Sequence, residues 1–235
     1  MHSRTLTSIT YKDKKVHNVK KEVAKISNEF FPKDNAQEDK QIHLQIWQQV
    51  KQNQNEIIDE AEITFNEVMI ALESFNDKKA SGEDHITIEI CKQYFLAQPQ
   101  VITSLYNKCL ALEYFPKKWK EARILLIPKP SVNGGANNNE FRPIGLLPVI
   151  SKIFEKIIHT RLMRHIYHKQ LISKHQYGFM PSKSSEATLK RIIKGIETGL
   201  QLKRKMILIS IDIKGAFNNT WWPNLILRLR NKFGV

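Results

Sequence analysis

Apolar positions recur with helical spacing through two segments near the middle of the chain. Thr64 and Glu67 have the spacing of a capping box, which predicts that a helix begins there. The apolar residues that follow at helical spacing are Phe65, Val68, Met69, Leu72 and Phe75. The polar stretch 78–85 ends this helix, and a second helix is predicted through Val101, Leu105, Tyr106, Cys109 and Leu112. We expect both apolar stripes to form core.

Two short apolar runs favour strands rather than helices. Residues 123–128 (RILLIP) end at a proline, which suits a short strand. Residues 206–213 (MILISIDI) are almost continuously apolar, which predicts a strand buried on both faces. Residues 133–139 are rich in Asn and Gly and predict a loop between the first strand and the helix that follows.

Three further helices are predicted after this loop. The first begins near Val149 and has an apolar side made of Ile153, Phe154, Ile157, Ile158 and Leu162. Its other side is a basic stripe of Lys152, Lys156, Arg161 and Arg164. A helix over 186–200 has the same character, and Pro223 suits the first position of a last helix.

The first 63 residues are predicted to be short helices joined by polar linkers. Val19, Val23, Ile26 and Phe30 mark one amphipathic face that ends at Pro32, and residues 51–56 are a polar linker. The elements together predict an α/β (α+β) fold.

The positive charge is concentrated after residue 75. Residues 1–75 hold 10 Lys and Arg against 12 Asp and Glu, whereas residues 76–235 hold 27 against 11, a net charge of +16. A surface so basic favours a polyanion such as nucleic acid, and the alternative is a basic surface that only keeps the protein soluble.

Cysteine content and hydropathy limit the cellular compartments in which the protein is expected. Cys91 and Cys109 are the only cysteines, so no disulfide framework or zinc site is expected, and both are interpreted as small buried hydrophobic residues. No apolar run reaches the ~20 residues of a membrane span, and residues 1–20 contain no apolar signal segment. We therefore expect no membrane partner and a nuclear or cytoplasmic location.

One aspartate and two cations are candidates for chemistry. Asp212 is the only aspartate after Asp84, and it lies near the end of the predicted buried strand. A carboxylate there suits Mg²⁺, which binds one or two carboxylates together with waters and substrate phosphates. A strand-end aspartate that caps a loop or pairs with a lysine is the alternative. Lys129 and Arg142 flank the Asn/Gly loop, where they could bind phosphate or be solvated surface charges.

These segments resemble one family in wording and in order. Residues 127–129 with 141–162 are similar to the first fingers motifs of non-LTR retrotransposon reverse transcriptases. Residues 176–179 (QYGF) with 183–188 resemble the next motif, and 209–217 (ISIDIKGAF) resemble motif A. Residues 79–86 are a variant of the family's opening loop that keeps Gly82, Asp84 and Ile86. Phe30, Phe31 and Pro32 are similar to the linker that precedes this domain in the R1-like branch of the LINE-type family.

The resemblance implies a role for each matching residue. Asp212 would be the first catalytic aspartate and a metal ligand, joined by the backbone carbonyl of Ile213. The other implied contacts are with the nucleotide (Lys129, Arg142, Ala216 and Phe217, the last as steric gate) and with the template (Gln176 and Gly178). The cofactor would be Mg²⁺, two ions in the parent enzyme, with Mn²⁺ as the alternative. The substrates would be an RNA template, a DNA primer or target and dNTPs.

The resemblance also implies an organisation. Residues 1–63 would be a helical or linker extension, 64–205 the fingers region and 206–235 the start of an incomplete palm. No Tyr-x-Asp-Asp sequence is present, so we expect a truncated polymerase that is inactive alone. Asn218 and Met180 stand where the family usually has Asp and Arg. The rivals are a non-enzymatic nucleic-acid-binding fragment and a splicing maturase relative. If the roles hold, Arg142 and Asp212 should face each other across about 8–15 Å.

Overall fold

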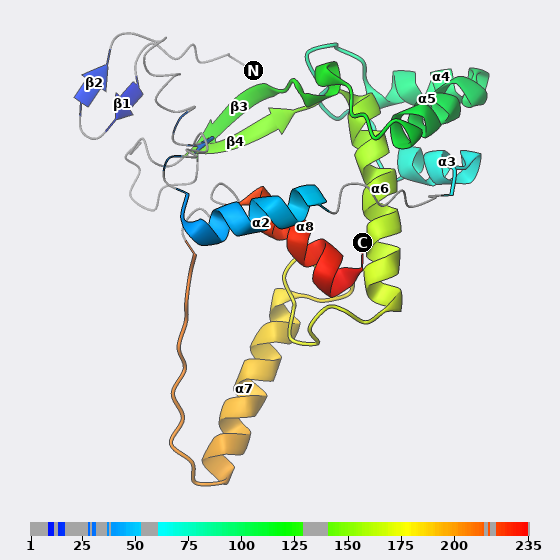
Figure 1. Cartoon of the computed structure of the whole chain (residues 1–235). Coiled ribbons are helices and arrows are strands. Elements are labelled where there is room, and N and C mark those ends of the chain that lie inside the picture. Colours follow the sequence, from blue (N-terminus) through cyan, green and yellow to red (C-terminus); the bar gives the residue numbers. More distant parts are fainter. Residues whose placement is uncertain are drawn as a thin grey trace. The chain divides into compact units, whose positions relative to one another are not determined.

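The computed structural model of the protein describes residues 9–11, 14–16, 28, 30, 31, 37, 39–52, 61–128, 141–213, 216 and 220–234. The chain divides into two units, Met1–Leu162 and Met163–Val235, and each is considered separately. Figure 1 labels the elements. The amphipathic face predicted around Val19 and Val23 and the loop 133–139 lie outside the described residues.

The first unit is mostly helical. Two strand pairs, β1 (Ile9–Tyr11) with β2 (Lys14–Val16) and β3 (Arg123–Pro128) with β4 (Phe141–Leu146), are both antiparallel. The helices are α2 (Gln41–Gln52), α3 (Phe65–Glu73), α4 (Ile88–Ala97), α5 (Pro99–Ala111), the short 3-10 helix η3 (Lys117–Lys120) and α6 (Val149–His168), whose last turns belong to the second unit. Lys51 and Gln52 end α2, so the linker predicted over 51–56 was wrong at those two positions.

The core of the first unit lies among α3, α4, α5 and the first half of α6. Tyr106 and Phe95 are fully buried there. The Tyr106 ring stacks on Phe154 at 5.2 Å and meets Trp119 edge-on at 6.0 Å, geometries that aromatic rings prefer. The Tyr106 hydroxyl donates to the carbonyl of Ile150 at 2.8 Å, so its polar end is satisfied inside the core. Cys91 and Cys109 are buried free thiols, as expected.

The predicted helices are present, with three differences. In α3 Val68 and Leu72 are buried, but Phe65 is 44% exposed, so it was wrong to place Phe65 in the core. Helix α4 was missed, although Ile88, Cys91 and Phe95 have the spacing of a buried face. In α5 the buried residues are Ile102, Tyr106 and Cys109, so it was wrong to place Val101, Leu105 and Leu112 in the core. The buried stripe of α5 is shifted because α4 and α6, rather than the most apolar arc of α5, determine which side is covered.

Gly82 allows the loop between α3 and α4 to lie directly against the start of α6. A Cβ atom added at Gly82 would be 2.7 Å from the backbone nitrogen of Pro148 and 2.8 Å from the carbonyl carbon of Leu147. These distances are shorter than real Cβ contacts, and backbone atoms cannot move aside as a flexible side chain can. The glycine in the predicted opening loop is therefore required by close approach of two backbone segments.

Arg161 links α6 to the beginning of α3. Its guanidinium donates to the Glu67 carboxylate at 2.7 and 2.8 Å, and to the carbonyls of Ala61 at 2.6 Å and Glu62 at 2.8 Å. Glu67 also completes the predicted capping box, since it accepts from the backbone nitrogen of Thr64 at 2.9 Å. Arg161, predicted on the basic side of α6, therefore has a structural role that the sequence did not indicate.

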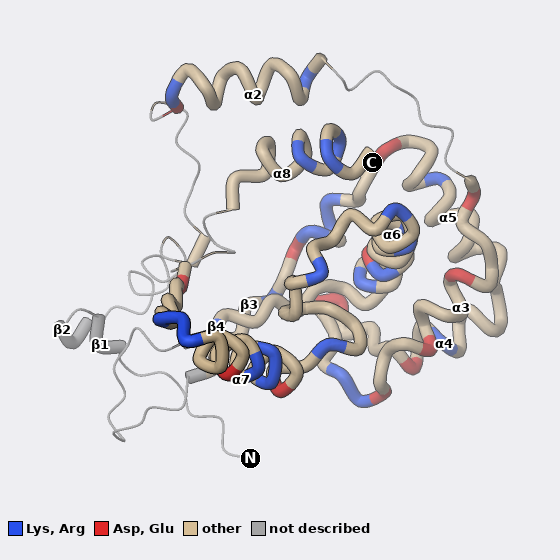
Figure 2. The backbone as a smooth tube through the Cα atoms, turned by 90° about the horizontal axis from the view of Figure 1, so that it is seen from below, with Lys and Arg blue, Asp and Glu red and all other residues tan. Residues whose placement is uncertain are grey.

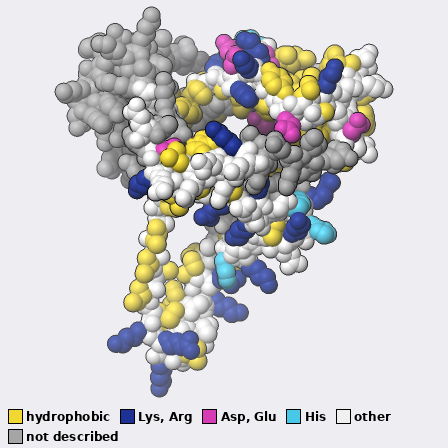
Figure 3. All heavy atoms as spheres, viewed as in Figure 1, with side chains coloured by type: hydrophobic (Ala, Val, Ile, Leu, Met, Phe, Trp, Pro, Cys, Tyr) yellow, Lys and Arg dark blue, Asp and Glu magenta, His cyan; other side chains and the backbone are white. Residues whose placement is uncertain are grey.

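The second unit contains the end of α6, α7 (Ser185–Gln201), α8 (Trp222–Arg228) and the π-helical turn η4 (Leu229–Phe233). Pro223 lies in the first turn of α8, one position later than predicted, because the helix begins at Trp222. Residues 204–213 form no strand with any described residue. Figure 3 shows hydrophobic side chains along this segment, and Ile207 and Ile211 are 86% and 84% exposed. The prediction of a buried strand over 206–213 was therefore wrong.

Candidate functional site

Arg142 lies near the end of the β3–β4 hairpin. In the register of the two strands it is opposite Ile127, next to the last pair, Pro128 with Phe141. Its side chain is exposed and forms no ion pair within the described part of the chain. A guanidinium presented in this way can bind phosphate through two nitrogens. Lys129, predicted to act with it, lies outside the described residues.

Asp212 is exposed in the extended segment after α7. It was predicted at the end of a buried strand, so the desolvation argument for a metal there does not apply. No salt bridge between Asp212 and any described residue is present, so the alternative pairing with a lysine is not seen among them. The neighbouring Ile213 is 72% exposed, and Ala216 is exposed with its carbonyl accepting from Thr220 at 2.8 Å. Phe217 lies outside the described residues.

The segment that contains Gln176 and Gly178 is held by its own hydrogen bonds. The Gln176 side-chain amide donates to the carbonyl of Gly178 at 2.8 Å. The ammonium of Lys183 donates to the carbonyls of Gln176 at 2.7 Å and Lys174 at 3.1 Å, and it lies 5.0 Å from the centre of the Tyr177 ring. The sequence motif included Lys183 without a role, and the structure shows that Lys183 shapes this turn.

The structure brings only some of the predicted site residues into one unit. Gln176, Gly178, Asp212, Ile213 and Ala216 belong to the second unit, whereas Arg142 belongs to the first. The expected separation between Arg142 and Asp212 therefore remains a prediction, as do the proposed domain boundaries.

The described residues supply only part of the ligand set that a metal site needs. They contain no group of three or more His, Cys, Asp or Glu side chains that could hold an ion. The Asp212 carboxylate and the Ile213 carbonyl are oxygen donors of the kind that Mg²⁺ accepts, but one carboxylate does not hold two metal ions. Further ligands would have to come from other residues or from substrate.

Basic side chains recur on the helices of both units. Figure 2 shows Lys and Arg along α6 and α7. No described helix has the combined length and apolar character that a membrane span requires.

Comparison with known proteins identifies the family. Residues 127–234 match the family described as "Reverse transcriptase (RNA-dependent DNA polymerase)". This range contains Arg142, the 176–179 motif and Asp212. Residues 127–234 of the chain therefore match the reverse transcriptase family.

The similar proteins come from transposable elements. The chain is 30% identical over 171 residues to the "Probable RNA-directed DNA polymerase from transposon BS" of Drosophila melanogaster, covering 73% of this chain and 19% of that protein. It is 29% identical over 178 residues to the "Retrovirus-related Pol polyprotein from type-1 retrotransposable element R1" of Bradysia coprophila, covering 74% and 17%. It is 32% identical over 162 residues to the "Probable RNA-directed DNA polymerase from transposon X-element" of Drosophila melanogaster, covering 66% and 17%.

The resemblance to non-LTR retrotransposon reverse transcriptases is thus confirmed. The chain spans about a fifth of the length of these relatives.

Proposed function

We propose that this chain supplies nucleotide- and template-binding residues of an RNA-directed DNA polymerase. The observation that carries the proposal is the reverse transcriptase match over 127–234, which includes every described residue to which the motifs assign a role. In this proposal the fold is the fingers and the first part of the palm. The parent enzyme copies an RNA template from a DNA primer with dNTPs.

Each residue has a proposed part in binding. Arg142, with Lys129, binds the triphosphate of the incoming nucleotide. Gln176 and Gly178 lie next to the template base, on a turn whose shape is maintained by Lys183. Ala216 and Phe217 border the sugar. This arrangement orients the nucleotide before reaction, which is a large part of the catalysis of phosphoryl transfer.

Asp212 and the carbonyl of Ile213 are the proposed metal ligands. Bound Mg²⁺, or Mn²⁺ as the alternative, would supply the positive charge that activates a primer hydroxyl and stabilises leaving pyrophosphate. Asp212 is exposed and makes no salt bridge with a described residue, so its carboxylate is accessible for this purpose. The second set of carboxylates that two-metal chemistry needs is not among the described residues.

We expect the 235-residue chain to bind nucleic acid in a strongly salt-dependent manner. If about five phosphates are neutralised, affinity should fall on the order of 10²–10³-fold between 50 and 200 mM salt. Fluorescence anisotropy with a labelled RNA–DNA hybrid measures this, and residues 1–75, with a net charge of −2, serve as the weakly binding control. A flat salt response would contradict the electrostatic basis of the proposal.

We expect no primer extension by the 235-residue chain alone. A single aspartate cannot position two metal ions, so an RNA template with a DNA primer, dNTPs and Mg²⁺ should yield only background product. Product length on a denaturing gel is the readout. Extension that is lost in Asp212→Ala would show that the chain is catalytically complete, contrary to the proposal.

A further inference from the structure

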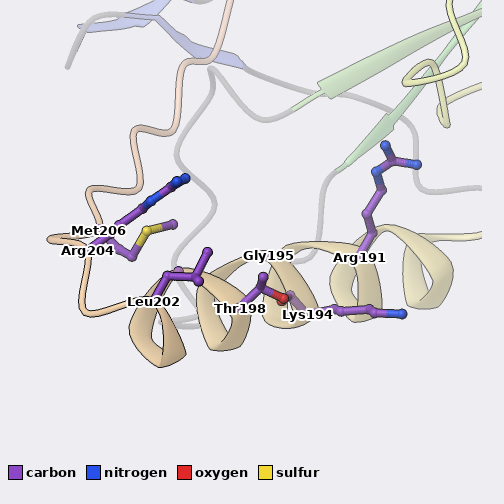
Figure 4. Close-up of a pocket in the computed structure, with 8 residues that line it drawn as sticks. Arg191, Lys194, Gly195, Thr198, Leu202, Arg204 and Met206 are labelled. Atoms are coloured by element: carbon purple, nitrogen blue, oxygen red, sulfur yellow. The ribbon is translucent and has the colours of Figure 1, made fainter.

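Helix α7 and the segment after it enclose a basic hollow that the assigned roles do not use. It has a volume of about 500 Å³ and is lined by Arg191, Lys194, Gly195, Thr198, Gly199, Leu202, Arg204 and Met206. Figure 4 shows Arg191 and Arg204 projecting from the helical end and the segment end of this hollow, with the small residues Gly195 and Thr198 between them. Gly195 carries no side chain, and a Cβ added there would meet nothing within 4 Å, so the hollow is open above this part of the helix.

The turn that ends α7 positions Arg204. Lys203 has the left-handed conformation, with φ of 54°, and the backbone nitrogen of Arg204 donates to the carbonyl of Gly199 at 2.9 Å. This hydrogen bond closes a Schellman motif, which folds the chain back along the last turn of the helix. As a result, a residue that follows the helix shares a surface with Thr198 and Gly199 inside it.

The hollow is electropositive. None of the described residues that line it is acidic, and none of its three cations forms an ion pair with a described residue. The carboxylate of Glu186 in the first turn of α7 is engaged by Lys190 at 2.7 Å. Among the described residues, Arg191 has one weak hydrogen-bond partner, the Tyr177 hydroxyl at 3.4 Å, which leaves most of its five donors unused by them. Three cations spread along one hollow favour a bound polyanion.

The length and the apolar lining of the hollow indicate which anion. From Arg191 to Leu202 is 11 residues of helix, or roughly 16 Å at 1.5 Å each, which matches about five stacked nucleotides at 3.4 Å each. Leu202 and Met206, 58% and 45% exposed, add apolar surface that unpaired bases can cover. A duplex keeps its base faces stacked inside the helix, whereas a single strand can present phosphates and base faces together.

We propose that this hollow binds the backbone of single-stranded nucleic acid, with Arg191, Lys194 and Arg204 contacting phosphates at different points along the strand. The proposal rests on the nucleic-acid-binding function proposed above and adds a defined contact surface to it. It assigns the strand to a face of α7 that carries none of the residues given roles in nucleotide or metal binding.

Two double variants of equal charge test the proposal. Arg191→Gln with Arg204→Gln removes two cations of the hollow, whereas Lys203→Gln with Lys205→Gln removes two neighbouring cations that do not line it. The probe is a labelled 15-nucleotide oligo(U) or oligo(dT), titrated into the 235-residue chain at several salt concentrations. We expect the hollow variant to bind ~10–50-fold more weakly and its salt slope to fall by about 1.4, since each single-strand phosphate contact contributes about 0.7. The control should change binding by less than about threefold.

The outcomes separate this proposal from the wider function. Equal weakening by the two variants would show diffuse attraction and overturn the hollow as a site. A duplex that binds as tightly as the single strand, with the same sensitivity to the hollow variant, would overturn the preference for single strands. Absence of binding by the unmodified chain would instead contradict the nucleic-acid-binding function itself. Circular dichroism of both variants, whose substitutions are all at exposed positions, establishes that each is folded.

Discussion

Replacing Gly82 with alanine is expected to lower the free energy of unfolding by about 2–3 kcal/mol. The added methyl group would lie 2.7–2.9 Å from backbone atoms of Leu147 and Pro148, and relief requires the loop to move away from the start of α6. That movement would uncover neighbouring core side chains such as Ile88 and Val149, which are almost fully buried. Urea unfolding followed by circular dichroism measures the loss.

Gly145→Ala is the matched control in the same unit. A Cβ at Gly145 would be 3.7 Å from the Ala122 and Ile124 side chains, which is ordinary van der Waals contact. We expect a change within about 0.5 kcal/mol, because the substitution fills accessible space on β4. Equal destabilisation by the two variants would contradict the explanation by close backbone approach.

Replacing Arg161 with alanine is expected to cost about 2–3 kcal/mol of stability. The change removes both hydrogen bonds to Glu67 and leaves the carbonyls of Ala61 and Glu62 without this donor. Arg161→Lys should recover only part of the loss, since an ammonium cannot reproduce the planar two-point contact. Arg164→Ala, one turn away at an exposed position, should change stability by less than about 0.5 kcal/mol. A larger effect at Arg164 than at Arg161 would refute this assignment.

The same pair predicts how stability depends on acid. The hydrogen bonds from Arg161 lower the pKa of Glu67 from 4.5 to about 2. Because the folded-state pKa is the lower one, the contribution is fully present above pH 4.5 and is lost as pH falls toward 2. The Glu67 and Arg161 side chains are each 20% accessible to solvent, which reduces the expected contribution to about 1–2 kcal/mol. Unfolding curves at several pH values should show a smaller acid-dependent loss in Arg161→Ala than in the unmodified chain.

The motifs and the local helix signals could be read from the amino-acid sequence. The capping box at Thr64 and Glu67 depends on residues three apart, so its geometry is local and was predicted correctly. The apolar side of α6 was also correct at Ile153, Phe154 and Ile157, because 3.6-residue periodicity places them on one face. The family followed from motif wording and order, and comparison with known proteins confirmed it.

Burial and pairing were decided by tertiary structure. The apolar run at 206–213 predicted a buried strand, yet burial requires neighbouring strands on its edges and layers on its faces, and the described residues provide no such strand. The same reason applies to Arg161, which helical spacing places on the basic side of a helix without indicating its partner. Its partners lie 94 to 100 residues earlier in the chain, a contact that only folding brings together. Sequence periodicity predicted most of the helices, whereas long-range packing determined which of their faces are covered and whether the apolar run 206–213 pairs as a strand.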